Sequence, residues 1–233
     1  MNDRVTTTIT DGIADVRLTR ADKMNAIDPA MFEAIGAAID ALHDRTDVRC
    51  VVLSGEGRGF CAGLDMASMA RGGSGTGIAR NDQGSILPQH VTWGWRQLPM
   101  PVIAAVHGVA FGGGFQIMSG ACIRIAAPDT RFAIRETHWG LVPDMAGFPI
   151  WRGLVRDDVL RELVYTRANS MRRRRCTTAS SRGWRTTLTK PPWRWRARSP
   201  DAARMRSAGQ SACSTWRTTP TRARCWRRRR PNS

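Results

Sequence analysis

Two glycine-rich turns hold the residues of this chain that are best suited to bind a developing negative charge. The first spans Gly59–Asp65 and the second spans His107–Gln116, and each follows a β-rich apolar run and precedes an expected helix. Glycine lets the backbone approach a ligand closely, and the first N–H groups of a helix have no partner within that helix. For either turn taken alone, tight turns needed only for close packing are the default interpretation. The two together predict backbone donors aimed at one anion.

The residues before the first turn predict two strands, a helix and a third strand. Val5–Ile9 and Ile13–Leu18 alternate in polarity on either side of an Asp-Gly pair, which is typical of a β-hairpin. Asp28 is followed by proline and predicts the start of a helix over Pro29–His43, whose apolar residues recur at helical spacing. Val48–Leu53 is a continuous β-rich run, as expected for a strand buried on both faces.

The same order returns further along the chain. Val102–Val106 predicts a strand, Gly112–Gly120 a loop entering a helix, and Ile123–Ala126 and Phe132–Ile134 further strands. Between the two halves, Arg71–Gln89 is rich in glycine and predicts a mobile surface loop. It is not a phosphate loop, because no Gly-Lys-Ser/Thr follows it. This alternation predicts an α/β fold.

Four motifs, in order, resemble those of the crotonase superfamily, also called the enoyl-CoA hydratase/isomerase family, over about residues 5–168. Asp22–Ile27 resembles its CoA-contacting segment, Gly59–Asp65 and Gly112–Gly114 its two oxyanion turns, and Glu136–Pro143 the stretch that bears a catalytic carboxylate. The resemblance implies a crotonase-type ββα spiral that acts on acyl-CoA thioesters. It also implies a homo-oligomer, either a trimer or a hexamer.

The resemblance further implies which residues meet the substrate. The N–H groups of Leu64 and Gly113 would hold the thioester oxygen, on which negative charge grows as an α-proton leaves. Each such preorganised donor can contribute on the order of 3 kcal/mol. Coenzyme A enters as part of the substrate, so no separate cofactor is expected. The residues expected to contact it are Lys23, Asn25, Ala26, Ala62, Gly63 and Asp65.

The acid–base residues differ from those of the hydratases that the chain resembles. Those enzymes use two glutamates; one aligns with Glu136, but the other falls at Gln116, which cannot exchange protons and can only orient a neighbour. Asp144 stands where dienoyl-CoA isomerases carry a second carboxylate, and this favours proton shuttling between Glu136 and Asp144. Two alternatives stay open: Gln116 as a helix residue satisfied by nearby backbone, and Asp144 as the cap of a following helix.

The last quarter of the chain differs in composition from the rest. Residues 1–169 carry 17 Lys and Arg against 18 Asp and Glu, whereas residues 170–233 carry 19 against one and hold a single large aliphatic residue, Leu188. This predicts a core over 1–168 and a disordered, Arg/Trp-rich tail over 169–233 that lacks the family's C-terminal helices. Such a composition is typical of a GC-rich gene translated out of frame, which predicts a frameshift near Arg167.

Two other interpretations of the tail remain. Clustered arginines interleaved with tryptophans could bind a nucleic acid, although no nucleic-acid-binding motif is present. Alternatively, the chain is an inactive, truncated remnant.

Several classes of protein are disfavoured by the sequence. The six cysteines include no Cys-x-x-Cys pair, which argues against a zinc site, and neither another metal site nor a nicotinamide site is visible. No apolar run approaches the length of a membrane span, and the N-terminus is polar rather than a signal peptide. We therefore expect a cytoplasmic enzyme.

Overall fold

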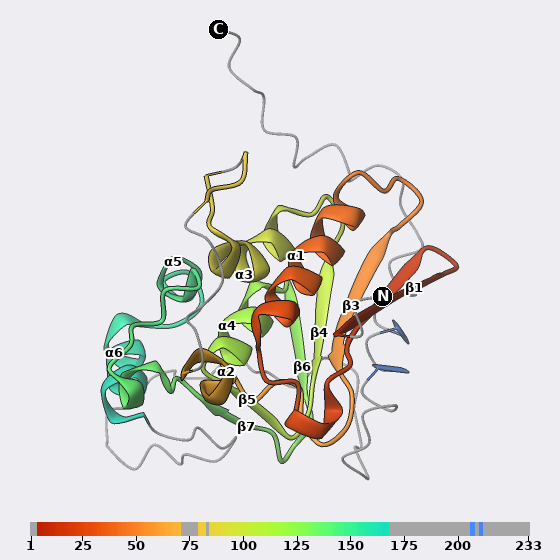
Figure 1. The fold of residues 1–233 in the computed structure, drawn as a ribbon. Helices are drawn as coiled ribbons and strands as arrows, with labels where there is room; N and C mark the ends of the chain where they lie inside the picture. The colour runs from red at the N-terminus through yellow and green to blue at the C-terminus, as the bar shows by residue number, and fades with distance from the viewer. Residues whose placement is uncertain (1–3, 71–78, 83, 168–205, 208–209, 212–233) are drawn as a thin grey trace, which may run out of the picture.

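A computed structural model describes residues 4–70, 79–82, 84–167, 206–207 and 210–211 (Figure 1). Most of the basic tail and residues 71–78 and 83 of the glycine-rich loop therefore lie outside the described residues. The predictions of a disordered tail, a frameshift and a nucleic-acid-binding arm fall on that part of the chain.

The main sheet has five strands in the order β1-β2-β3-β4-β6. β1 pairs antiparallel with β2, and every later pair is parallel. The carboxyl ends of the parallel strands therefore meet at one edge, where ligands bind in α/β folds. β3 leads into the first glycine turn at this edge and β4 into the second. The strands are β1 (Val5–Thr10), β2 (Ile13–Leu18), β3 (Cys50–Gly55), β4 (Val102–Val106) and β6 (Ile123–Ala126).

Three helices cover one face of this sheet: α1 (Pro29–His43), α3 (Leu87–Gln97) and α4 (Gly113–Gly120) (Figure 1). α1 begins where the sequence predicts, because the Asp28 carboxylate accepts a hydrogen bond from the Met31 N–H at 2.8 Å. The side chains between helices and sheet form one apolar core that includes Ile35, Leu53, Trp95 and Ile117.

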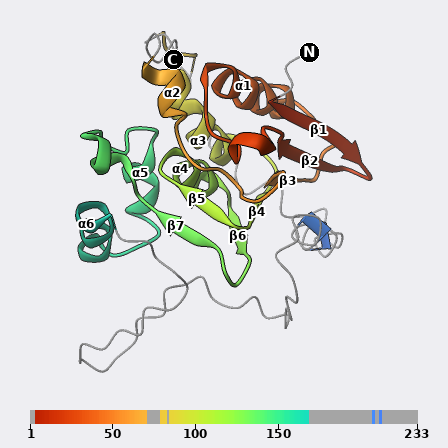
Figure 2. The ribbon, with the colours of Figure 1, turned by 60° about the horizontal axis from the view of Figure 1, so that its bottom comes forward.

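A small second sheet and several short helices complete the described chain. β5 (Val109–Phe111) and β7 (Arg131–Ala133) pair in parallel beside the first turn. In Figure 2, α5 and α6 lie on the far side of this small sheet from β1 and β2. The short helices are η1 (Ala21–Lys23), α2 (Met66–Ala70), η2 (Glu136–Trp139), α5 (Gly147–Trp151) and α6 (Asp157–Thr166).

The predicted hairpin, α1, β4 and β6 are confirmed, and three predictions need correction. β3 covers residues 50–55 rather than 48–53, and β5 forms inside the segment predicted as a turn. α3 begins at Leu87, within the segment predicted as a loop. This helix buries His90, Thr92 and Gly94 along with its apolar residues, so its sequence lacks a clear apolar stripe.

Candidate active site

The first glycine turn runs as an extended segment between two neighbours. On one side Cys61 pairs with Ala110 of β5, and on the other Leu64 lies opposite Ile27 in a parallel bridge. Ile27 makes both hydrogen bonds of that bridge, donating to the Gly63 carbonyl at 2.8 Å and accepting from the Asp65 N–H at 2.9 Å. In a parallel bridge, the residue opposite the one that makes both hydrogen bonds, here Leu64, points its own N–H away from the partner strand. The Leu64 N–H therefore faces away from Ile27.

The second glycine turn lies against the first. Gly112 has φ +49° and ψ −119°, a conformation that favours glycine, and its N–H donates to the Ala133 carbonyl at 2.9 Å. α4 then begins at Gly113. A β-carbon added at Gly63 would lie 3.7 Å from the Gly113 nitrogen, and one added at Gly114 would lie 2.6 Å from the Cys61 carbonyl oxygen. The two turns are therefore packed backbone to backbone.

Neither the Leu64 N–H nor the Gly113 N–H has a hydrogen-bond acceptor within the part of the chain that the structure describes. Gly113 is also the first residue of α4, so the partial positive charge of that helix end adds to its donor. Gly113 is buried and Leu64 is partly buried, and unpaired backbone donors at buried positions are rare in folded proteins. The two unpaired donors thus belong to two turns that pack against each other.

Glu136 lies beside the second turn, at Gly112. Glu136 is the first residue of η2 and is buried, with 6% of the residue exposed. A β-carbon added at Gly112 would lie 3.5 Å from Oε1 and 3.7 Å from Oε2 of Glu136. Oε1 accepts a hydrogen bond from Nε2 of Gln116 at 2.6 Å, whereas Oε2 is buried with no partner among the described residues. One carboxylate oxygen is thus held and the other is left unpaired.

Gln116 connects Glu136 to the start of α5. Its Oε1 accepts a hydrogen bond from the Gly147 N–H at 3.0 Å, while its Nε2 donates to Glu136. The sequence-based alternative of satisfaction by nearby backbone is therefore only half right. No local signal in the sequence marks the contact between Gln116 and Glu136, because twenty residues separate them and neither spacing nor periodicity pairs them.

Burial raises the pKa of Glu136 above its ordinary value. Hydrogen bonds from the backbone of Glu136, from the Gln116 side chain and from the backbone of Arg135 oppose this effect on the pKa, and the charge of Asp144 adds to it. A carboxyl group with a raised pKa and an unpaired oxygen is suited to accept and return a proton.

Asp144 lies on the exposed side of the same region. The N-cap of α5 is Ala146, so the alternative that Asp144 caps the next helix is wrong. Asp144 lines an open hollow of about 530 Å³. Its other lining residues include Trp93, Val142 and Phe148, which are apolar. The structure brings Asp144 within electrostatic range of Glu136, and it places Asp144 nearer to solvent.

The residues expected to contact coenzyme A fall into two groups. Lys23 is exposed at the end of η1, and Ala62, whose N–H donates to the Met24 carbonyl at 2.9 Å, is partly exposed. Asn25 is fully buried instead, and its Nδ2 donates to three carbonyl oxygens at 2.9 to 3.1 Å. Those carbonyls belong to Glu56, Gly59 and Phe60. The Asn25 side chain therefore fixes the backbone of the segment that leads from β3 into the first turn.

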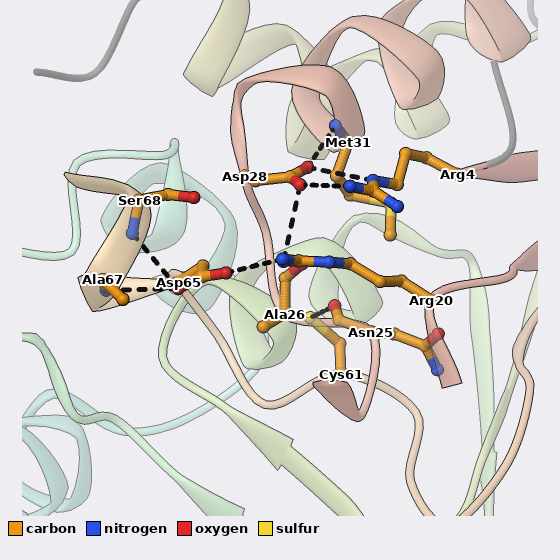
Figure 3. A network of polar contacts seen from close by, with 10 residues as sticks. All are labelled: Arg4, Arg20, Asn25, Ala26, Asp28, Met31, Cys61, Asp65, Ala67 and Ser68. Atoms are coloured by element: carbon orange, nitrogen blue, oxygen red, sulfur yellow. Dashed lines mark hydrogen bonds and ion pairs between the residues drawn. The ribbon is translucent and has the colours of Figure 1, made fainter. Parts of the chain in front are cut away.

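Asp65 and Ala26 are tied to an arginine that the sequence did not single out, Arg20. Oδ2 of Asp65 lies 2.7 Å from the Arg20 guanidinium, and the Ala26 carbonyl accepts a hydrogen bond from Arg20 at 3.0 Å (Figure 3). Burial alone would raise the pKa of Asp65. The hydrogen bonds from Arg20 and from the backbone of α2 outweigh it and hold the pKa below its ordinary value.

Cys61 stands inside the first turn but is poorly suited to act as a nucleophile. Burial raises the pKa of its thiol to about 12, and the thiol donates to the Asn25 carbonyl at 3.1 Å.

No group of three or more His, Cys, Asp or Glu side chains that could hold a metal ion occurs among the described residues. In that same part of the chain, no helix has the length and apolar character needed to cross a bilayer.

Comparison with known proteins gives a consistent result. The family model described as "Enoyl-CoA hydratase/isomerase" matches residues 8–172. An enoyl-CoA hydratase of Mycobacterium tuberculosis, EchA19, is 32% identical over 153 residues, which cover 66% of this chain and 54% of that protein. A mitochondrial Δ(3,5)-Δ(2,4)-dienoyl-CoA isomerase of Dictyostelium discoideum is 27% identical and covers 66% of this chain and 55% of its own length.

Solved structures agree with this result. The crystal structure of an enoyl-CoA hydratase from M. tuberculosis H37Rv superposes with a TM-score of 0.61 at 29% identity, covering 72% of this chain and 63% of the other. The fold is thus a crotonase-type α/β fold. The chain belongs to the enoyl-CoA hydratase/isomerase family. It spans about half the length of the curated relatives that it matches.

Proposed function

We propose that the chain is an acyl-CoA enzyme that stabilises a thioester enolate. One observation carries this proposal: the unpaired N–H groups of Leu64 and Gly113 lie on two touching turns, beside a buried carboxyl group with one free oxygen. A thioester oxygen accepting from both donors would gain negative charge where the donors already point, so little reorganisation is needed during the reaction.

In this mechanism Glu136 is the principal acid and base. Its unpaired Oε2 removes a proton from the acyl chain, and the electron pair left on carbon delocalises onto the thioester oxygen held by Leu64 and Gly113. Gln116 holds the other carboxylate oxygen and so fixes the direction of Oε2. Asp144, protonated beforehand from solvent, delivers a proton further along the conjugated chain, and the proton held by Glu136 then passes to solvent. The net result is a shift of double bonds with no change in composition.

Dienoyl double-bond isomerisation is the first candidate reaction because of the contact between Gln116 and Glu136. Where two-glutamate hydratases place a second proton donor, this chain has an amide bound to Glu136. Hydration of a 2-enoyl-CoA is the second candidate, since several similar proteins are named enoyl-CoA hydratases.

Binding of the coenzyme A portion is assigned to the segments around Lys23–Ala26 and Ala62–Asp65. Lys23 is free to meet a phosphate, whereas Ala62 and Gly63 would present backbone. No added cofactor is needed for the reaction. Assembly into a trimer or hexamer belongs to the same proposal, and sedimentation of the purified full chain tests it.

The experiment that tests the function follows the ultraviolet spectrum of 3,5-dienoyl-CoA and 2-enoyl-CoA during incubation with the full 233-residue chain. Formation of a 2,4-dienoyl-CoA at a rate dependent on enzyme concentration supports isomerisation. Conversion of the 2-enoyl-CoA alone would favour hydration. Turnover of neither substrate, by a chain that also fails to bind them, contradicts the proposal.

A further inference from the structure

The Arg20 guanidinium contacts the first turn at Asp65, the N-terminus of α1 at Asp28 and the chain before α1 at Ala26. It forms an ion pair with Oδ2 of Asp65 at 2.7 Å, lies 3.5 Å from Oδ2 of Asp28, and donates to the Ala26 carbonyl at 3.0 Å. The side chains of Arg20 and Asp65 are only 11% and 13% exposed. Figure 3 shows the Arg20 guanidinium beside both carboxylates, with Arg4 also beside Asp28.

The charges in this cluster balance. Arg4 pairs with Asp28 at 2.8 Å, so two guanidinium groups face two carboxylates. Both carboxylates are also used by helices, because Asp28 caps α1 and Asp65 accepts from the N–H groups of Ala67 and Ser68 in α2. Breaking one member of such a cluster leaves a largely buried partner charge, which is costly.

The contacts of Arg20 flank the bridge that orients Leu64. Ala26 immediately precedes Ile27, and Asp65 immediately follows Leu64. Ile27 in turn makes the two hydrogen bonds, to Gly63 and from Asp65, that leave the Leu64 N–H facing away from Ile27. Arg20 therefore joins both sides of the bridge from outside, without any contact to the second turn among its described hydrogen bonds and ion pairs.

We propose that Arg20 is a positioning residue. Through Asp65 and Ala26 it holds the Leu64 N–H in the orientation in which this group and the Gly113 N–H both donate to the same thioester oxygen. This inference rests on the proposed function and adds a residue to it. Arginine suits the role because its planar, always charged fork reaches several oxygens at once, which a lysine ammonium cannot do in the same geometry. Substrate need not touch Arg20 for the effect to reach the reacting oxygen.

The first test reads the donors directly. Wild type, Arg20→Gln and Asp65→Asn are each mixed with an acyl-CoA that carries ¹³C at the thioester carbonyl, and the carbonyl stretching frequency is measured by infrared difference spectroscopy. Hydrogen bonds to the carbonyl lower this frequency. We expect a clear downshift in wild type, a smaller one in both variants, and a kcat that falls about 10- to 100-fold with little change in KM.

The second test needs no ligand and separates this inference from the proposed function. Hydrogen exchange of peptides covering residues 20–30 and 58–68 is compared in the same three proteins. We expect the amides of Ile27 and Asp65 to exchange at least about tenfold faster in the variants, because the bridge opens more often. If wild type binds no acyl-CoA, the proposed function fails, and this comparison still decides whether Arg20 holds the bridge.

The matched control is Arg17→Gln. Arg17 pairs with Asp15 of β2 at 2.8 Å and lies 3.7 Å from Oε1 of Glu56, and neither of these described ion pairs involves residues 59–65. It should leave the carbonyl frequency, kcat and the exchange of Ile27 and Asp65 unchanged. Should Arg20→Gln fail to fold, Asp65→Asn decides alone, since asparagine keeps an oxygen to cap α2. The inference would be overturned if Asp65→Asn and a folded Arg20→Gln both showed the same amide exchange rates and the same carbonyl frequency as wild type.

Discussion

The two halves of the candidate site are built in opposite ways. Around Leu64 the backbone is fixed by a bridge to Ile27 and by a cluster in which each charged side chain has a partner. Around Glu136 a buried carboxyl group keeps one oxygen unpaired, and burial raises its pKa. The difference agrees with the proposed roles of the two halves, which are charge stabilisation around Leu64 and proton transfer at Glu136. A donor that only stabilises charge must stay still, whereas a group that moves a proton must keep an oxygen free.

This comparison predicts that the two halves respond differently to substitution. Changes near Glu136 should alter proton transfer and its pH dependence while leaving binding intact. Changes near the two turns should alter how the thioester oxygen is held, with no shift in pH dependence.

The largest effect is expected for Glu136→Gln. Glutamine fills the same volume but accepts no proton, so kcat should fall by about 10²- to 10⁴-fold. Binding of an acyl-CoA, measured by calorimetry, should remain within a few-fold of wild type because ground-state contacts persist. Full activity in this variant would remove Glu136 from the mechanism.

Next in size is Gly113→Ala, which adds a methyl group without removing the N–H. The new β-carbon would lie 2.9 Å from Cδ1 of Ile27 and 3.0 Å from the Met145 sulfur, so these side chains must move at the site itself. We expect kcat/KM to fall about tenfold or more, since small misplacements of a donor are costly. The control is Gly153→Ala, whose β-carbon meets no atom closer than 3.8 Å. Equal losses in both variants would contradict a local role for Gly113.

Gln116→Leu is expected to shift the pH dependence. The hydrogen bond from Gln116 lowers the pKa of Glu136 and so opposes the effect of burial. Removing it should raise that pKa further. Because the ionised form is the base, the acidic limb of the kcat/KM profile should move to higher pH. A limb that stays in place would show that Gln116 does not act on Glu136.

Asp144→Asn is expected to give the smallest shift, in the opposite direction. The charge of Asp144 raises the pKa of Glu136, so its removal should move the acidic limb to lower pH. The same variant should slow isomerisation of a 3,5-dienoyl-CoA more than hydration of a 2-enoyl-CoA, because only isomerisation uses both carboxylates. Equal loss in both reactions would exclude Asp144 as the second proton carrier.

Much of the fold could be predicted from the sequence where local signals agree with burial. The hairpin, α1 with its Asp28 cap, and β4 carry strong patterns, and the structure confirms them. α3 could not be predicted because it buries polar and small residues, which only tertiary packing explains.

The site was predictable in its motifs but not in its contacts. The glycine turns and Glu136 were found from residue types and from resemblance. The roles of Gln116 and Arg20 depend on contacts between segments 20 and 45 residues apart, which no local pattern encodes. Asn25 shows the reverse case, since the sequence predicts a ligand contact and the structure places its side chain among backbone carbonyls.

The most direct test of the central claim is exchange of an α-proton with solvent. The full chain is incubated in D₂O with a saturated acyl-CoA, which can form an enolate but has no double bond to move or hydrate. Mass spectrometry then follows deuterium at the α-carbon. We predict enzyme-dependent deuterium incorporation that Glu136→Gln abolishes. Binding of the acyl-CoA with no exchange above the uncatalysed rate would contradict the account.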